Sequence, residues 1–400
     1  MVMISSCRMT LVVACLISLL GVFGAHAIAT DKVQSSTLVR QEAVHPYVEK
    51  IGKFALGSLL HRVSPELGVE AVAFDPNGNE VATGSADNAI TIWNVASGQA
   101  MRTFYYHTGK VNFIAYAPDG GMILTGSKDH RAVIWDPHTT YVDREFVDTE
   151  PVESVSFSRS GMFIITGSDN RLAKLWDTRS GQQVCVLNGH TGKVEAVAMN
   201  PEGGTAVTGS EDMTAKIWKV DECIAQKEGH LDRPEVTLYG HTGSVTAISF
   251  SPYGRWIITG SQDYTARMWD AKTGSSLGIL GLGKDGKCEN CHKAGIEAVA
   301  WIPPPPIPSS WKEEDDKVAT ASNDGTVKLW QAHSGKLLHT FTHGGKVHSV
   351  AFDAKGERLV SGSSDGTAKI WSLGTYQLEK TLRGNMITPS KPFLPGQPQR

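Results

Sequence analysis

Short stretches that alternate apolar and polar residues recur along most of the chain, separated by turn sequences rich in Gly, Asp, Asn and Ser. In one unit, residues 194–198 (VEAVA) alternate, residues 200–203 (NPEG) form a turn signal, and a second apolar stretch ends at residues 208–210 (TGS). A two-residue period is typical of β-strands that bury one face. The pattern therefore predicts an all-β chain of short antiparallel strands joined by tight turns.

One tryptophan closes the third strand-like stretch of each unit. These residues are Trp93, Trp135, Trp176, Trp218, Trp269, Trp330 and Trp371. Successive intervals are 42, 41, 42, 51, 61 and 41 residues, so four intervals agree within one residue and two contain insertions. A four-stranded unit of this size cannot bury both of its faces alone. We therefore predict a seven-bladed β-propeller of four-stranded antiparallel blades over residues 54–384.

Gly-His pairs precede several units, and Trp-Asp pairs close several third strands, as at residues 189–190, 240–241, 135–136, 176–177 and 269–270. With these pairs the sequence resembles the WD-repeat propeller family over residues 54–384. The resemblance implies a structural network in a blade, which joins a His before the first strand, a Ser or Thr of the second, the Asp of the next turn and the Trp of the third. The matching positions are His107, Thr125, Asp129 and Trp135; His190, Thr208, Asp212 and Trp218; His241, Thr259, Asp263 and Trp269; His292, Thr320, Asp324 and Trp330; and His343, Ser361, Asp365 and Trp371.

Two units depart from this pattern. The first unit has residues 65–68 (PELG) where the His is expected, and the third offers Thr149 and Glu150 there, with Asp169 displaced by one position. A buried His and Asp each need a hydrogen-bond partner, because burying an unpaired polar group is costly. We therefore expect blades one and three to be less rigid than the others.

Closure of the ring is ambiguous in the sequence. Residues 57–63 (GSLLHRV) resemble residues 335–341 (GKLLHTF), an expected outer strand, and residues 376–382 also have outer-strand spacing. Seven blades thus have eight candidate outer strands. We expect residues 57–63 to close the ring on blade seven, because joining the two chain ends removes a free sheet edge.

The first residues read as an export signal. Arg8 precedes an apolar run over residues 10–23, and residues 25–27 (AHA) form a small-x-small cleavage site. We predict a signal peptide over residues 1–27 cleaved after Ala27, a linker over 28–53, and a periplasmic or secreted protein. Retention of the run as a membrane anchor is the main alternative, and lipid attachment at Cys15 is disfavoured because the apolar run continues beyond it. Residues 385–400 are expected to be a Pro-rich flexible tail.

Insertions interrupt the repeat at residues 221–235, 281–291 and 303–316. Loops alternate between the two rims of a propeller, so we expect 221–235 and 303–316 on one rim and 281–291 on the other. The run Pro303 to Pro306 predicts a stiff polyproline stretch, either a recognition segment or a rigid spacer.

Residues 288–292 (CENCH) spell the attachment pattern of c-type haem, in which Cys288 and Cys291 would bond the porphyrin and His292 would ligate iron. However, His292 already has the place of a network histidine. We therefore expect a Cys288–Cys291 disulfide or a shared metal site before haem, and keep a c-type haem or redox protein as the alternative function. No resident cofactor or metal is expected.

The net charge and the remaining motifs argue against nucleic-acid binding and against two kinds of enzyme site. The formal net charge is -3, or -4 after loss of Arg8 with the signal, which gives no reason to expect nucleic acid as a partner. Residues 281–287 (GLGKDGK) lack the Ser or Thr of a P-loop, and residues 362–366 (GSSDG) match the turn of blade seven rather than a nucleophile elbow. We predict no enzyme but a protein-interaction scaffold, whose partner rim holds Lys110, Lys128, Lys193, Gln262 and Lys346.

Overall fold

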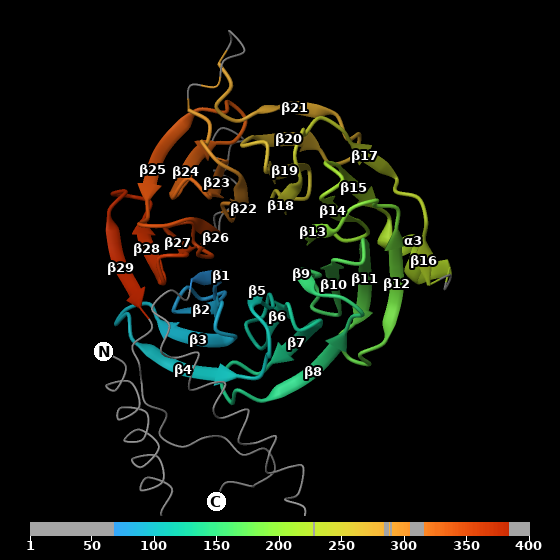
Figure 1. The fold of residues 1–400 in the computed structure, drawn as a ribbon, viewed down its shortest axis with the longest axis horizontal. Coiled ribbons are helices and arrows are strands. Elements are labelled where there is room, and N and C mark those ends of the chain that lie inside the picture. Colours follow the sequence, from blue (N-terminus) through green and yellow to red (C-terminus); the bar gives the residue numbers. More distant parts are fainter. Residues whose placement is uncertain (1–67, 227–228, 284–287, 289, 305–315, 384–400) are drawn as a thin grey trace, which may run out of the picture. The chain divides into compact units, whose positions relative to one another are not determined.

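The computed structural model describes residues 68–226, 229–283, 288, 290–304 and 316–383. These residues form seven small β-sheets arranged around a ring (Figure 1), which confirms the predicted seven-bladed propeller. The predicted signal, linker and tail lie outside the described residues, as do residues 57–63, so those four assignments stay predictions. The described residues contain no helix with the length and hydrophobicity of a transmembrane span.

Each blade is a meander of about six-residue strands. Blades one to three contain β1 (Val69–Phe74), β2 (Glu80–Ser85), β3 (Ala89–Asn94), β4 (Ala100–Tyr105), β5 (Val111–Tyr116), β6 (Ile123–Ser127), β7 (Arg131–Trp135), β8 (Val142–Val147), β9 (Val152–Phe157), β10 (Phe163–Ser168), β11 (Leu172–Asp177) and β12 (Gln183–Asn188). Blade four contains β13 (Val194–Met199), β14 (Ala206–Ser210), β15 (Ala215–Trp218) and β17 (Val236–Leu238), and its insertion forms α3 (Val220–Gln226) and β16 (His230–Leu231). Blades five to seven contain β18 (Val245–Phe250), β19 (Trp256–Ser261), β20 (Ala266–Asp270), β21 (Ser276–Ile279), β22 (Ile296–Trp301), β23 (Lys317–Ser322), β24 (Thr326–Gln331), β25 (Leu337–Thr342), β26 (Val347–Phe352), β27 (Arg358–Ser363), β28 (Thr367–Ser372) and β29 (Leu378–Arg383).

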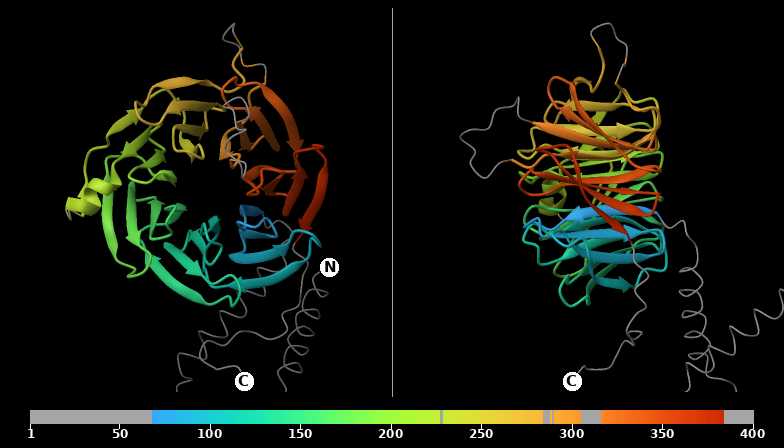
Figure 2. Two further views of the ribbon diagram at one scale, coloured as in Figure 1. Left: turned by 180° about the vertical axis from the view of Figure 1, so that it is seen from behind. Right: turned by 90° about the vertical axis from the view of Figure 1, so that its left-hand side faces the viewer.

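The first strand of every blade lies near the axis of the ring and the fourth lies at its periphery (Figure 1). Because neighbouring strands are antiparallel, turns between the second and third strands lie on the same rim as the links from one blade to the next. We call this the His–Asp rim, and the other the opposite rim; Figure 2 shows the strands running between them. By this topology, the described residues 281–283, 288 and 290–291 belong to the His–Asp rim, and the described residues 221–226, 229–235, 303–304 and 316 belong to the opposite rim.

A β-bulge follows the first residue of every inner strand. In blade four, Val194 pairs with Ser210 but Ala196 pairs with Gly209, so Glu195 is left between them. The same shift occurs in the other six blades. A bulge turns its extra residue out of the regular alternation, so the propeller presents one such side chain per blade at the His–Asp end of the inner strands.

The hydrophobic core is divided among the contacts between neighbouring blades. In one cluster, Ile217 of blade four packs with Ile257 and Trp269 of blade five. The third-strand tryptophans are all buried, with exposed fractions of 0–7%. Each sheet therefore supplies the apolar cover that its neighbour lacks.

Blade one packs directly on blade seven. Val72 N–H donates to Ser349 Oγ at 3.1 Å, and a Cβ at Gly362 would lie 2.8 Å from the Val69 side chain. The described sheet of blade seven has four strands, with β29 as its outer strand.

Candidate functional site

Four polar side chains form one hydrogen-bonded chain inside blade four. His190 Nδ1 lies 2.7 Å from Asp212 Oδ2, His190 Nε2 lies 2.7 Å from Thr208 Oγ1, and Trp218 Nε1 donates to the same hydroxyl at 2.9 Å. A carboxylate only accepts, so Nδ1 carries the proton and the Thr208 hydroxyl donates to Nε2. The chain of bonds runs from Trp218 through Thr208 and His190 to Asp212.

The same four groups meet in blades two, five and six. His107 contacts Asp129 and Thr125, and Trp135 donates to Thr125. The equivalent contacts in blade five join His241, Asp263, Thr259 and Trp269, and those in blade six join His292, Asp324, Thr320 and Trp330.

Hydrogen bonds hold the network aspartates in their charged form. Burial alone would raise the pKa of Asp212, but the hydrogen bonds from His190 and Thr214 outweigh it and hold the pKa well below its usual value. The pKa values of Asp263 and Asp324 are lowered in the same way. In blades two, four, five and six, both ring nitrogens of the network histidine form hydrogen bonds within the blade.

Blade seven keeps a looser version of the network. His343 Nε2 lies 2.7 Å from Ser361 Oγ, and Trp371 donates to the same hydroxyl. His343 Nδ1, however, lies 3.4 Å from Asp365 Oδ2 and makes no hydrogen bond among the described residues. Burial, helped by Lys369, lowers the pKa of His343 to about 4.

Blade three replaces the histidine with a buried ion pair that the sequence reasoning missed. The residue four positions before the first strand is Asp148, not Thr149 or Glu150, and Lys174 Nζ lies 2.7 Å from its Oδ1. Asn170, at the position of the network Asp, donates to the same oxygen at 2.7 Å. In the blades that have the network His, the His lies four residues before the first strand and the Asp lies six residues before the Trp. Counting back in this way from Val152 and Trp176 would have identified Asp148 and Asn170.

Asp169 was expected as the displaced network residue of blade three. It points instead to blade four, where it pairs with Lys193 at 2.7 Å. In blade one, Trp93 still donates to Thr83 at 2.9 Å, and the segment at 65–67 where the histidine is missing lies outside the described residues. The lower rigidity expected of these two blades stays a prediction.

The predicted rim side chains mostly face carboxylates of a neighbouring blade. Lys110 pairs with Glu70 at 2.8 Å, and Lys128 pairs with Glu153. Gln262 donates to Glu297 at 2.9 Å. Lys346 is exposed, with no side-chain partner in the described part of the chain. The rim is thus a mixture of both charges rather than a basic surface.

The carboxylates come from the bulge position of the inner strands, a repeated feature that the sequence reasoning did not use. The seven residues at this position are Glu70, Asn112, Glu153, Glu195, Thr246, Glu297 and His348. The signal is visible in the sequence as the residue after the first apolar residue of each inner strand. Four of the seven are acidic. These carboxylates offset the positive charge of the rim lysines at the inner part of the rim.

Glu153 has the most perturbed environment among these residues. Burial raises its pKa to about 7, although Lys128 acts against burial, and Asp169 adds to the rise. Asn112 Nδ2 also donates to Glu153 at 3.0 Å. Burial likewise raises the pKa of Glu195. Crowded carboxylates of this kind stabilise an added positive or hydrogen-donating group.

The same rim exposes large apolar side chains on blades four and five. Met213 and Tyr264 occupy the turns between second and third strands and are 47% and 49% exposed. Tyr239, in the link between these blades, is 75% exposed. Aromatic and Met side chains are enriched where proteins bind each other.

The Cys288–Cys291 pair does not fit a haem site. The two cysteines form a disulfide with each other, whereas haem attachment needs both sulfurs for the porphyrin. His292 is 5% exposed, and its two ring nitrogens contact Asp324 and Thr320 at 2.9 and 2.7 Å. Iron ligation would break the network of blade six.

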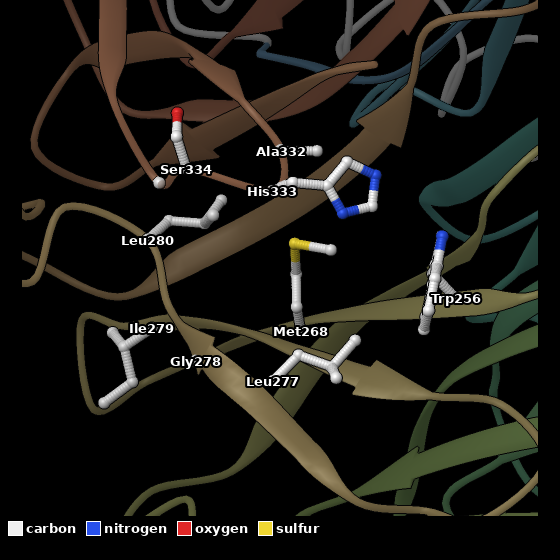
Figure 3. Close-up of a pocket in the computed structure, with 10 residues that line it drawn as sticks. Trp256, Met268, Leu277, Gly278, Ile279, Leu280, Ala332, His333 and Ser334 are labelled. Carbon is white, nitrogen blue, oxygen red and sulfur yellow. The ribbon is translucent and has the colours of Figure 1, made fainter. Parts of the chain in front are cut away.

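A groove of about 350 Å³ opens between blades five and six, away from the residues discussed so far. Trp256, Met268 and Leu277 of blade five face His333 of blade six across it (Figure 3). His333 Nε2 lies 3.1 Å from Asp316 Oδ2, and the ring packs edge-on against Trp256. Asp316 and Trp256 therefore fix the orientation of the imidazole at the wall of the groove.

Comparisons with known proteins agree with the geometry. A family model described as "WD domain, G-beta repeat" matches residues 57–94, 98–136, 144–177, 181–219, 232–270, 284–331 and 335–372. The chain is 32% identical over 127 residues to WD repeat-containing protein 1 of Gallus gallus, covering 32% of this chain and 18% of the relative. It is 32% identical over 119 residues to Mitochondrial division protein 1 of Vanderwaltozyma polyspora, covering 30% of this chain and 17% of the relative.

A third relative is Nuclear distribution protein PAC1 of Arthroderma otae, which is 32% identical over 130 residues, 31% of this chain and 28% of the relative. Each match thus spans less than a third of the relative's length. The family model, in contrast, matches seven consecutive repeats over more than half of the chain, one for each observed blade. The chain therefore belongs to the WD-repeat family of β-propellers.

Proposed function

We propose that this protein is an exported, non-enzymatic scaffold that binds protein partners through its His–Asp rim. Relationship to WD-repeat propellers suggests a protein-interaction scaffold, and the family is in general non-catalytic. The titratable side chains of the network form hydrogen bonds within their own blades, which is a structural role. Function therefore rests on the surface that the blades display.

The observation that carries the proposal is the exposure of Met213, Tyr239 and Tyr264 on one rim. Met213 and Tyr264 have φ angles of 65° and 72°, in the left-handed region that disfavours bulky side chains. Blades six and seven have Gly325 and Gly366 at the same turn position. The two bulky residues thus add strain and little packing to the fold, whereas a partner would bury them.

Charge on the rim favours a protein over a polyanion. Glu70, Glu153 and Asp169 neutralise three of the predicted rim lysines. Binding to a nucleic acid draws on clustered uncompensated Lys and Arg, and these three lysines are compensated. A partner with mixed polar groups around an apolar centre matches this surface better.

A pull-down with two matched triple variants tests the rim. The first variant, M213A/Y239A/Y264A, removes three exposed residues of the His–Asp rim on blades four and five. The control, Y141A/M162A/Y253A, removes the same residue types from the opposite rim, where they are 57%, 59% and 42% exposed. Partners captured by the wild-type chain from an extracytoplasmic fraction should be lost with the first variant and kept with the control. Equal capture by both variants would contradict the proposal.

A charge-reversal variant of the same rim gives a second readout. Replacing Lys110, Lys193 and Lys346 with Glu leaves Glu70 and Asp169 facing new negative charges. We expect weaker capture of the same partners, because the reversed rim no longer has the mixture of both charges that a partner with mixed polar groups would complement. If every partner were captured as before, the three lysines would not be part of the binding surface.

Export is supported by the cysteines. Cys185 pairs with Cys223 and Cys288 with Cys291, and disulfides persist mainly in oxidising compartments. With the predicted signal over residues 1–27, this favours a periplasmic or secreted protein. N-terminal sequencing of the protein from its natural source should begin near Ile28; a chain that still begins at Met1 would contradict cleavage.

A further inference from the structure

The insertion of blade four leaves its own blade and joins the neighbouring one. After β15, the chain forms α3 and then β16, which lies alongside β12 at the outer edge of blade three (Figure 1). β16 runs parallel to β12, with His230 and Leu231 opposite Val186 and Leu187. The chain then returns to complete blade four with β17. Among the sheets that the structure describes, only the sheet of blade three has a fifth strand.

A disulfide fixes this excursion. Cys185 of β12 and Cys223 of α3 are bonded across 38 positions of sequence, and they are 0% and 1% exposed. Both sulfurs lie in the apolar cluster between blades three and four, together with the buried Val220 and the partly buried Ile224 and Leu231. The bond ties two elements that no turn or hairpin connects.

Besides this apolar packing, the described residues of the segment form few polar contacts with blade three. α3 has seven residues, fewer than a helix needs to be stable alone. β16 has two residues, and Val186 N–H donates to Gly229 O at 2.9 Å. Lys219 pairs with Glu235 at 3.1 Å, but the side chains are 41% and 48% exposed, where ion pairs contribute little.

We propose that packing alone is too weak to hold α3 and β16 on blade three and that the Cys185–Cys223 disulfide is required, so that the insertion is a cover that closes on oxidation. Closure is a two-electron step. The two thiols lose two protons and two electrons, the Cys185–Cys223 S–S bond forms, and a disulfide oxidant of thiol–disulfide exchange is reduced to two thiols. Without the bond, the outward backbone groups of β12 are an open sheet edge.

Single-residue hydrogen exchange on the full chain tests the cover. The Val186 amide is the reporter, because it points outward to Gly229. In the Cys223→Ala variant, the amides of Val186 and α3 should exchange roughly tenfold faster or more than in the oxidised wild type, while those of β10 and β11 stay protected. The Cys288→Ala/Cys291→Ala variant is the control and should match the wild type. If Cys223→Ala fails to fold, the wild type after reduction by dithiothreitol replaces it.

Three results would overturn the proposal. Unchanged protection of Val186 without the disulfide would mean that packing suffices. Equal loss of protection in β10 and β11 would mean that blade three opens as a whole. Free Cys185 and Cys223 thiols in folded wild-type protein from an oxidising compartment would mean that the pair does not form. None of these results depends on a binding partner, so they leave the proposed scaffold function untouched.

Discussion

Single residues in this propeller show two ways to bury charge inside a blade. In blades two, four, five and six, the network His hydrogen-bonds to an Asp carboxylate that also accepts a hydrogen bond from a backbone N–H group. In blade three, Asp148 and Lys174 are 6% and 8% exposed and neutralise each other. The second solution depends more strongly on its partner, because each ion has lost most of its water.

Removing one member of the blade-three pair should therefore be costly. Asp148→Ala is expected to lower the free energy of unfolding by about 3–5 kcal/mol, because it leaves the Lys174 ammonium buried without a counter-charge. Adding Lys174→Met should recover most of that loss. Urea denaturation of the wild type, both single variants and the double variant measures the coupling; additive losses would contradict the ion-pair account.

The looser histidine of blade seven should give the protein a distinct pH response. The folded-state pKa of His343 is lowered to about 4, below the unfolded value of about 6.5. Between these two values the unfolded chain binds the proton first, so stability falls as the pH decreases from 6.5 to 4. The loss amounts to at most about 3 kcal/mol.

His343→Gln removes this titration while it keeps an acceptor for the Ser361 hydroxyl. The stability of the variant should therefore change less than that of the wild type over this pH window. Denaturation curves at several pH values compare the two proteins. Parallel pH profiles would show that His343 does not titrate as described.

At the scale of elements, close approach between blades decides which residues fit the second strand. A Cβ on Gly209 of β14 would lie 2.7 Å from the Val245 side chain and 2.9 Å from its carbonyl oxygen in blade five. Gly84, Gly126, Gly167, Gly260 and Gly362 meet the next inner strand in the same way. Blade six instead has Ala321, which is fully buried against blade seven. The distance between two neighbouring blades thus decides whether Gly or Ala fits at this position of the second strand.

We expect Gly209→Ala to reduce stability by about 1–3 kcal/mol, because the added methyl group overpacks the contact with β18. The reverse change in blade six, Ala321→Gly, should also reduce stability, because it removes a buried methyl group and frees the backbone. Thermal unfolding of both variants tests this. A stabilising effect of either substitution would contradict the blade-specific fit.

At the scale of the whole molecule, the ring is closed by packing between the first and last blades. Leu382 of β29 is 1% exposed and lies in one cluster with Val81 and Trp93 of blade one. Leu378, in the same strand, is 46% exposed. The outer strand of blade seven thus carries one residue that joins the chain ends and one that faces solvent.

Leu382→Ala should lower the free energy of unfolding by about 2–5 kcal/mol, because it opens a cavity at the seam. Leu378→Ala is the matched control and should be nearly neutral. Urea denaturation distinguishes them. Equal effects of the two substitutions would indicate that the seam does not stabilise the ring.

The sequence alone determined the number of blades, the strand order within a blade and the four residues that meet in blades two, four, five and six. It could do so because a repeat encodes its local hydrogen bonds at fixed spacing, as His190, Thr208, Asp212 and Trp218 illustrate. Only the tertiary structure decided which residues of different blades meet. Cys185 with Cys223, Lys110 with Glu70 and Asp169 with Lys193 are joined by the packing of separate sheets, and no spacing within a repeat records that packing.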